Sequence, residues 1–145
     1  MEHEIYKFSF LDFHLISVNF ELKTDKEYKM TKDIEISTNL TLRHDYQAGK
    51  KKIRLFMKVD VCGDKLPFSL SVEGVGQFGF LKKFDDVSKI DKLVRINCAA
   101  IIFPYIREIS ADIVRRSGLP QFNLPPANFV EFYNLNPKIK KRKIK

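Results

Sequence analysis

Two runs of the chain, residues 34–46 and 51–61, alternate apolar and polar side chains, a period typical of half-buried β-strands. The runs IEISTNLTLRHDY and KKIRLFMKVDV each place their apolar residues on one side and their polar residues on the other. The YQAGKKK segment between them contains Gly49, which tolerates turn conformations. The pattern predicts a β-hairpin with one apolar face, formed by Ile34, Ile36, Leu40, Leu42, Ile53, Leu55, Met57, Val59 and Val61.

Two further runs predict strands before and after this hairpin. PFSLSVEG follows the CGDKLP turn and places Phe68, Leu70 and Val72 on one face. The run Phe8 to Leu22 is apolar on both faces near its middle, which indicates a strand that is covered on both sides, carries a bulge or meets another subunit. The four runs together predict a four-stranded antiparallel sheet.

The apolar period changes after Phe84 and becomes helical. Ser88, with Asp91 three residues later, has the spacing of a capping box. Apolar residues then recur every three or four positions until Gly118, a typical helix stop, and Pro104 predicts a kink within this helix. This buried stripe consists of Cys98, Ile102, Ile106, Ile109 and Ile113.

A second, short helix is predicted in NFVEFYNL, with Asn128 as its N-cap and Glu131 at the third helical position. Because strands come first and helices follow, the predicted fold class is α+β. It combines a four-stranded antiparallel sheet with a long kinked helix and a short second helix on one face.

The charge of the chain is concentrated at its C-terminus. The chain has 145 residues and a net charge of +8, but six of its 26 cationic residues lie in the segment PKIKKRKIK. Without that segment, 20 cationic residues remain against 18 acidic ones, a net charge of +2. We therefore expect one domain over residues 1–136 and a basic, disordered tail over 137–145 that attracts acidic partners. A nucleic-acid partner is not expected, because the body lacks a basic face and the tail lacks aromatic residues.

Other features argue against export and membrane insertion. The N-terminus resembles no signal peptide, and no apolar run reaches the roughly 18 residues of a membrane helix. The two cysteines, Cys62 and Cys98, are too few for a disulfide framework. These observations predict a cytoplasmic protein without integral membrane contact.

Enzyme and metal signatures are weak. GVGQFG, residues 74–79, matches a dinucleotide-binding fingerprint, but the helix that should open at these glycines begins only near Ser88. Glycines that bend the end of a strand are the favoured interpretation. His3, His14 and His44 have no second ligand at helical spacing. We predict no enzymatic activity, no cofactor and no metal, and we interpret Cys98 as a small core residue.

The segment CAAIIFPYIREISADIVRRSGLPQFNLPPANFVEFY resembles the signature of the SecB-type protein-export chaperones. The markers are FPYIRE in the long helix, GLPQFNLPPANF in the loop, and the short helix after it. The preceding strands agree in number and order, so the resemblance covers roughly Phe8 to Tyr133, and the tail lies outside it.

The resemblance implies an ATP-independent holdase that binds unfolded or precursor polypeptides for export and assembles as a homotetramer, a dimer of dimers. Its apolar loop would line a groove between sheet and second helix, although core packing of the same side chains is an open alternative. By resemblance, the groove residues are Leu40, Leu42, Phe68, Phe122, Leu124, Phe129, Phe132 and Tyr133, and the contact between dimers includes Leu70 and Val72.

The same family binds the motor ATPase SecA through acidic residues on its first and fourth strands. The matching positions here are Ser17, Glu21 and Ser71, of which only Glu21 is acidic. Some relatives instead serve an antitoxin in toxin–antitoxin systems. The sequence therefore leaves two client classes open: unfolded preproteins, with SecA as a further partner, or an antitoxin.

Overall fold

The computed structural model describes residues 7–23, 36–46, 51–82 and 88–135. The predicted tail, 137–145, lies outside the described residues, as do Ile34, Gly49 and His3. The described chain forms a sheet and a helical layer, in the order β1 (Phe8–Leu22), β2 (Ser37–Tyr46), β3 (Lys52–Cys62), β4 (Phe68–Phe80), α1 (Ser88–Leu93), a π-helical segment (Val94–Cys98), α2 (Ala99–Arg116) and α3 (Phe129–Leu135).

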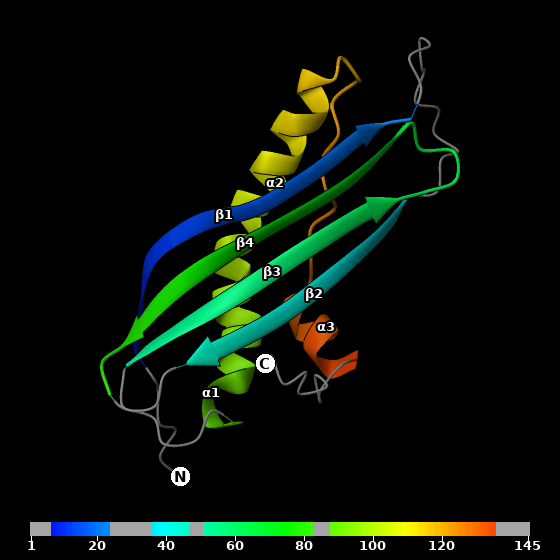
Figure 1. Ribbon diagram of the computed structural model, residues 1–145. Helices are drawn as coiled ribbons and strands as arrows, with labels where there is room; N and C mark the ends of the chain where they lie inside the picture. The colour runs from blue at the N-terminus through cyan, green and yellow to red at the C-terminus, as the bar shows by residue number, and fades with distance from the viewer. Residues whose placement is uncertain (1–6, 24–35, 47–50, 83–87, 136–145) are drawn as a thin grey trace.

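The four strands form one antiparallel sheet in the order β1-β4-β3-β2. α2 and α3 lie on the same side of this sheet, behind it in Figure 1. We call the side facing the helices the inner face and the opposite side the outer face. The predicted α+β class is confirmed, and β2 and β3 form the predicted hairpin, with Leu42 opposite Met57.

Strand β1 contains two bulges, which explain why its middle is apolar in both directions. The pairing with β4 shifts between Phe10 and Asp12 and again between Leu15 and Ser17. Each shift adds one residue to β1, Leu11 and Ile16, and both side chains are exposed. A bulge re-aims the side chains around it, so β1 presents apolar residues on more than one side.

Strand β4 does not end at its first glycine, as the sequence had suggested, but continues to Phe80. Gly74 and Gly76 lie close to side chains of α2, Ile106 and Ile102 respectively. A Cβ atom at Gly76 would lie 2.5 Å from Cγ2 of Ile102, and one at Gly74 would lie 2.3 Å from Cζ of Phe13. The glycine motif therefore permits close packing of sheet and helix instead of opening a nucleotide-binding helix.

The long helix runs continuously from Ser88 to Arg116. Of the predicted stripe, Cys98, Ile102 and Ile106 are fully buried. The helix ends as predicted, because Gly118 adopts a φ of 84° and its N–H donates to the Arg115 carbonyl at 3.1 Å. Pro104 lies inside α2, and the kink at that position stays a prediction.

Candidate functional site

The apolar loop after α2 runs back along the inner face toward α3 (Figure 1). Its side chains alternate: Phe122 and Leu124 are buried, whereas Gln121 and Asn123 are exposed. The ring of Phe122 meets that of Phe68 edge-on, with centroids 5.4 Å apart. The apolar half of the loop therefore extends the core, and the polar half faces solvent.

The backbone of this loop is also attached to the long helix. Nε of Arg107 donates a hydrogen bond to the carbonyl oxygen of Leu124 at 3.1 Å. Pro120, Pro125 and Pro126 are exposed, and their rings restrict the backbone on both sides of this anchor. The loop is thus held in an extended path although it contains no helix or strand.

Helix α3 begins with the predicted cap. Oδ1 of Asn128 accepts a hydrogen bond from the backbone N–H of Glu131 at 3.1 Å. Phe129 is buried edge-on against Phe103, with ring centroids 5.5 Å apart. Val130 and Leu135 remain 52% and 74% exposed. The short helix therefore offers apolar side chains to both the core and the solvent.

Seven of the eight predicted groove residues belong to the hydrophobic core cluster or pack against it. Five of them lie in the core, and Leu40 and Phe132 are partly buried against it. Tyr133 is partly buried beside the long helix. Their role in client binding stays a prediction, because the burial of the five core members equally fits the alternative of core packing. These five are Leu42, Phe68, Phe122, Leu124 and Phe129.

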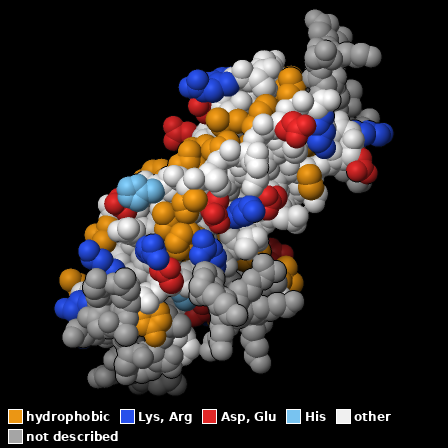
Figure 2. All heavy atoms as spheres, in the orientation of Figure 1, with side chains coloured by type: hydrophobic (Ala, Val, Ile, Leu, Met, Phe, Trp, Pro, Cys, Tyr) orange, Lys and Arg blue, Asp and Glu red, His pale blue; other side chains and the backbone are white. Residues whose placement is uncertain are grey.

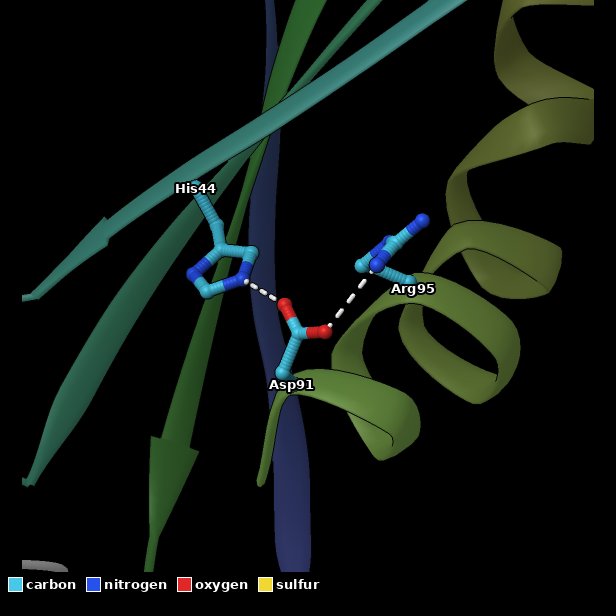
Figure 3. Close-up of polar contacts among 3 residues, drawn as sticks. All are labelled: His44, Asp91 and Arg95. Carbon is cyan, nitrogen blue, oxygen red and sulfur yellow. Dashed lines mark hydrogen bonds and ion pairs between the residues drawn. The ribbon is translucent and has the colours of Figure 1, made fainter. Parts of the chain in front are cut away.

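A polar cluster joins the sheet to the helices at one end of this region (Figure 3). Nε2 of His44, on β2, donates to Oδ1 of Asp91 at 2.7 Å, and Nη1 of Arg95 donates to Oδ2 of the same carboxylate at 3.1 Å. The Arg95 side chain is only 1% exposed, and its guanidinium carbon lies 4.5 Å from the ring centroid of Tyr133. This cluster links β2, α1, the π-helical segment and α3.

Sequence reasoning missed Arg95, because a lone arginine on a helix normally faces water. Its spacing of four residues from Asp91 was a usable signal, since that spacing places opposite charges side by side on a helix. Arg95 also lies in the π-helical segment, a local irregularity that occurs often at functional sites. The cluster contains no nucleophile, so we assign it the role of positioning α3.

We predict that Asp91→Asn lowers the unfolding free energy by about 1.5–3 kcal/mol at neutral pH, the usual range for hydrogen bonds to charged groups. Although burial alone would raise the pKa of Asp91, the hydrogen bonds and charges of His44 and Arg95 outweigh it and lower that pKa below 3.8. Because the pKa of Asp91 is lower in the folded state than in the unfolded state, its stabilising contribution is fully present above the unfolded-state pKa. That contribution is lost as the pH falls through the folded-state pKa. Urea unfolding between pH about 6 and about 3 should show this acid-dependent loss in the wild type and less of it in the variant.

Asp112→Asn is the matched control for this prediction. Asp112 pairs with Arg115 and Arg116 on the exposed surface of α2, so salt should screen its contribution. At high salt the Asp112 variant should unfold like the wild type. If the Asp91→Asn variant also had the same unfolding free energy as the wild type at every pH, the cluster would contribute nothing to stability.

The two residues predicted at the contact between dimers face inward. Leu70 and Val72 alternate with half-buried residues of the outer face of β4 and are 3% and 0% exposed within a single chain. Their part in an oligomer contact stays a prediction. A charged substitution at either position would also disturb the core of the single chain, so the pair is a poor probe of assembly.

The positions matched to motor docking lie on the outer face near one end of the sheet. Ser17 pairs with Glu73, and Asp60 pairs with Ser71. Glu21 and Asp60 line a shared depression there. The structure therefore places the carboxylates of Glu73 and Asp60 next to Ser17 and Ser71, the two positions where this chain has serine in place of an acidic residue. Matching the sequence position by position could not reveal these cross-strand neighbours. The docking role of Glu21 stays a prediction.

The described residues hold little that would support redox or metal chemistry. Cys98 is fully buried, as predicted for a core residue, and burial raises the pKa of its thiol to about 12. No group of three His, Cys, Asp or Glu side chains lies together within the described ranges. Over those same ranges, no helix is both long and apolar enough to cross a membrane.

Comparisons with known proteins agree with the fold and with the loop motif. The family model described as preprotein translocase subunit SecB matches residues 4–139. The protein-export protein SecB of Stenotrophomonas maltophilia is 34% identical over 71 residues, which are 49% of this chain and 40% of that protein. That of Hydrogenovibrio crunogenus is 40% identical over 70 residues, 48% of this chain and 46% of that protein. The matched region thus spans less than half the length of these relatives.

Two solved structures resemble this fold over more than four-fifths of the chain. A SecB-like chaperone of Mycobacterium tuberculosis, solved in complex with a peptide from an antitoxin, superposes with a TM-score of 0.69 at 14% identity, covering 83% of this chain and 90% of that one. A protein of unknown function from Streptococcus agalactiae superposes with a TM-score of 0.53 at 10% identity, covering 84% and 99%. The match of the family model to nearly the whole chain shows that this protein belongs to the SecB family.

Proposed function

We propose that this protein is a cytoplasmic, ATP-independent holdase that binds unfolded polypeptides on the apolar surface of α3, next to the loop. The observation that carries the proposal is the continuity of apolar residues from the core to the solvent. Phe129 is buried, Phe132 and Tyr133 are half-buried, and Val130 and Leu135 are exposed. Membership of the SecB family supports the same function.

Such a surface suits clients of many sequences. Apolar contacts stabilise a complex by about 25 cal/mol per Å² removed from water and require no particular hydrogen-bond pattern. Binding of this kind needs no nucleotide. Gly74 and Gly76, the first two glycines of the motif that resembled a dinucleotide fingerprint, are in close contact with α2 and β1, which leaves no space for a pyrophosphate beside them. An enzymatic role therefore has no support from this motif.

Two classes of client fit the proposal. Unfolded preproteins are suggested by the curated relatives, which are protein-export proteins, and SecA would then be a partner. An antitoxin segment is the second class, because the similar M. tuberculosis chaperone was solved with an antitoxin peptide. Capture from the native cell with the purified protein, followed by identification of the bound chains, would distinguish them.

We also propose assembly into a homotetramer of two dimers. Apolar side chains gather along the side of the molecule on which β1 lies (Figure 2). Leu15, Ile16 and Tyr105 are each more than two-fifths exposed in a single chain. An edge strand with exposed apolar residues is expected to pair with another chain.

The central experiment is a client dilution assay. An unfolded client diluted from denaturant in the presence of this protein should aggregate less, and the addition of ATP should change nothing. Sedimentation at micromolar concentration should give a tetramer. Saturable binding of nicotinamide or flavin nucleotides without any effect on aggregation would contradict the holdase, and a wild-type monomer would contradict the assembly.

A further inference from the structure

The outer face carries an open depression of about 600 Å³ at the end of the sheet where β3 begins. It is far along β3 from Glu21 and Asp60, which line the smaller depression at the opposite end. Residues of all four strands line it, and those that matter for its chemistry are Leu11, Asp45, Lys51, Lys52, Arg54 and Gly79.

The depression exists because of a glycine and a bulge. Gly79 on β4 has no side chain, and a Cβ atom built there would find Leu11 Cδ1 at 3.5 Å and Ser9 Oγ at 3.6 Å, both ordinary contact distances. The first bulge of β1 inserts Leu11, whose side chain is 46% exposed. Gly79 therefore contributes no side chain to the depression, and the partly exposed aliphatic side chain of Leu11 forms the wall next to it.

The charge around this depression is positive. The guanidinium of Arg54 pairs with the carboxylate of Asp45 through two hydrogen bonds, Nε to Oδ1 at 2.9 Å and Nη2 to Oδ2 at 2.7 Å. These two charges therefore offset each other. Lys51 and Lys52 are exposed, and neither forms an ion pair with an acidic residue of the described ranges. Within the described ranges, no carboxylate therefore offsets the charge of their two ammonium groups.

We propose that this depression binds an acidic segment of a partner polypeptide. An apolar side chain of the partner would enter the hollow over Gly79 and contact Leu11. Carboxylates next to it would pair with the ammonium groups of Lys51 and Lys52. The inference goes beyond the proposed holdase function, because the proposed client surface lies with the helices on the inner side of the sheet (Figure 1). The depression is lined by residues such as Arg54 and Gly79, which alternate with the buried inner-face residues of β3 and β4.

A polypeptide fits this surface better than a nucleic acid does. The visible outer face carries side chains of both charge signs (Figure 2). Asp45 lies within the depression, and Glu73 lies further along the same face, opposite Lys58. A phosphate backbone would need a continuous basic track, whereas a short acidic segment with one apolar residue needs only two cations and a hollow.

The probe is a fluorescein-labelled peptide with one leucine between pairs of glutamates, titrated with the full chain at low salt and followed by anisotropy. Lys51→Glu with Lys52→Glu should weaken binding about tenfold or more, since each exposed charge contact contributes up to about 1 kcal/mol. Lys23→Glu with Lys92→Glu makes the same change of net charge at exposed sites outside the depression and should leave the affinity within about twofold.

Gly79→Val tests the location without changing charge. Its methyl groups would fill the hollow, and valine suits a β-strand, so binding should fall while the melting temperature holds. The proposal would be overturned if the two lysine-pair variants lost the same amount of peptide affinity. It would also be overturned if a peptide with glutamine in place of glutamate bound as tightly as the acidic peptide. Tighter binding of single-stranded DNA, no binding of the peptide by the wild type, or a change of sedimentation with Gly79→Val alone would overturn it as well. Suppression of client aggregation should be unaffected by these variants, so failure here and failure of the holdase proposal are separable.

Discussion

Replacing Phe122 and Leu124 by alanine is expected to lower the unfolding free energy by about 2–5 kcal/mol at each position, the usual range for buried large-to-small changes. Both side chains are buried against the inner face, where Phe122 meets Phe68 and Leu124 is 1% exposed. Truncation leaves cavities that the anchored loop cannot fill, because Arg107 holds its backbone. Equilibrium urea unfolding would measure the loss.

Val130→Ser with Leu135→Ser is the matched pair for client binding. Both side chains are mostly exposed on α3, so the unfolding free energy should change by no more than about 0.5 kcal/mol. Affinity for an unfolded client should fall, because these residues form the solvent-facing part of the proposed surface. The alanine pair therefore tests the contribution of the loop to stability, and the serine pair tests the contribution of α3 to client binding.

The combined measurements decide between groove and core for the loop. If Phe122 and Leu124 are core residues, the folded fraction of the alanine variant should bind clients as the wild type does. If they line the groove, client affinity falls although the stability loss is small. Unchanged client binding in the serine pair would remove α3 from the proposed surface.

Gly76→Ala is expected to destabilise the protein by about 1–3 kcal/mol, the range for overpacking a filled core. The added Cβ would lie 2.5 Å from Cγ2 of Ile102 and 3.1 Å from Cε2 of Phe78. Ile102 is fully buried and branched at its Cβ atom, so Cγ2 has few alternative positions. The long helix would have to move away from the sheet.

Gly79→Ala provides a control in the same strand. A Cβ atom at Gly79 makes only ordinary contacts, so alanine should be neutral or slightly stabilising because it restricts the unfolded chain. Urea unfolding of both variants under one condition gives the difference directly. Equal stability of the two variants would mean that α2 does not need the glycine at position 76 for its approach.

Local features of the sequence determined most secondary structure. Alternation predicted the β2–β3 hairpin, and the observed pairing of Leu40 with Val59 confirms it. The side chain of Asn128 caps α3 as its type and position predicted, and Gly118 ends the long helix with a positive φ. Each of these signals acts within a few residues, so the local sequence contains the physical cause.

The resemblance of the loop identified the family but not the exposure of each side chain. Residues 121–124 belong to no helix or strand, so no periodic pattern was expected there. In the structure, Phe122 and Leu124 are nevertheless buried in the core. Whether an apolar loop residue is buried depends on what lies opposite. Here that is Phe68, more than fifty residues earlier in the chain.

Only the tertiary structure decided the order β1-β4-β3-β2, the length of β4 and the burial of Arg95. The glycines of β4 resembled a strand end until α2 was seen to pack on them, with Ile102 nearest to Gly76. Arg95, which the sequence analysis did not single out, is buried because Asp91 and Tyr133 lie against its guanidinium group. A short period in the sequence determines which way a side chain points. Which residues that side chain contacts depends on how distant segments pair. The entropy cost and the packing of such long-range pairings cannot be deduced from a local sequence pattern.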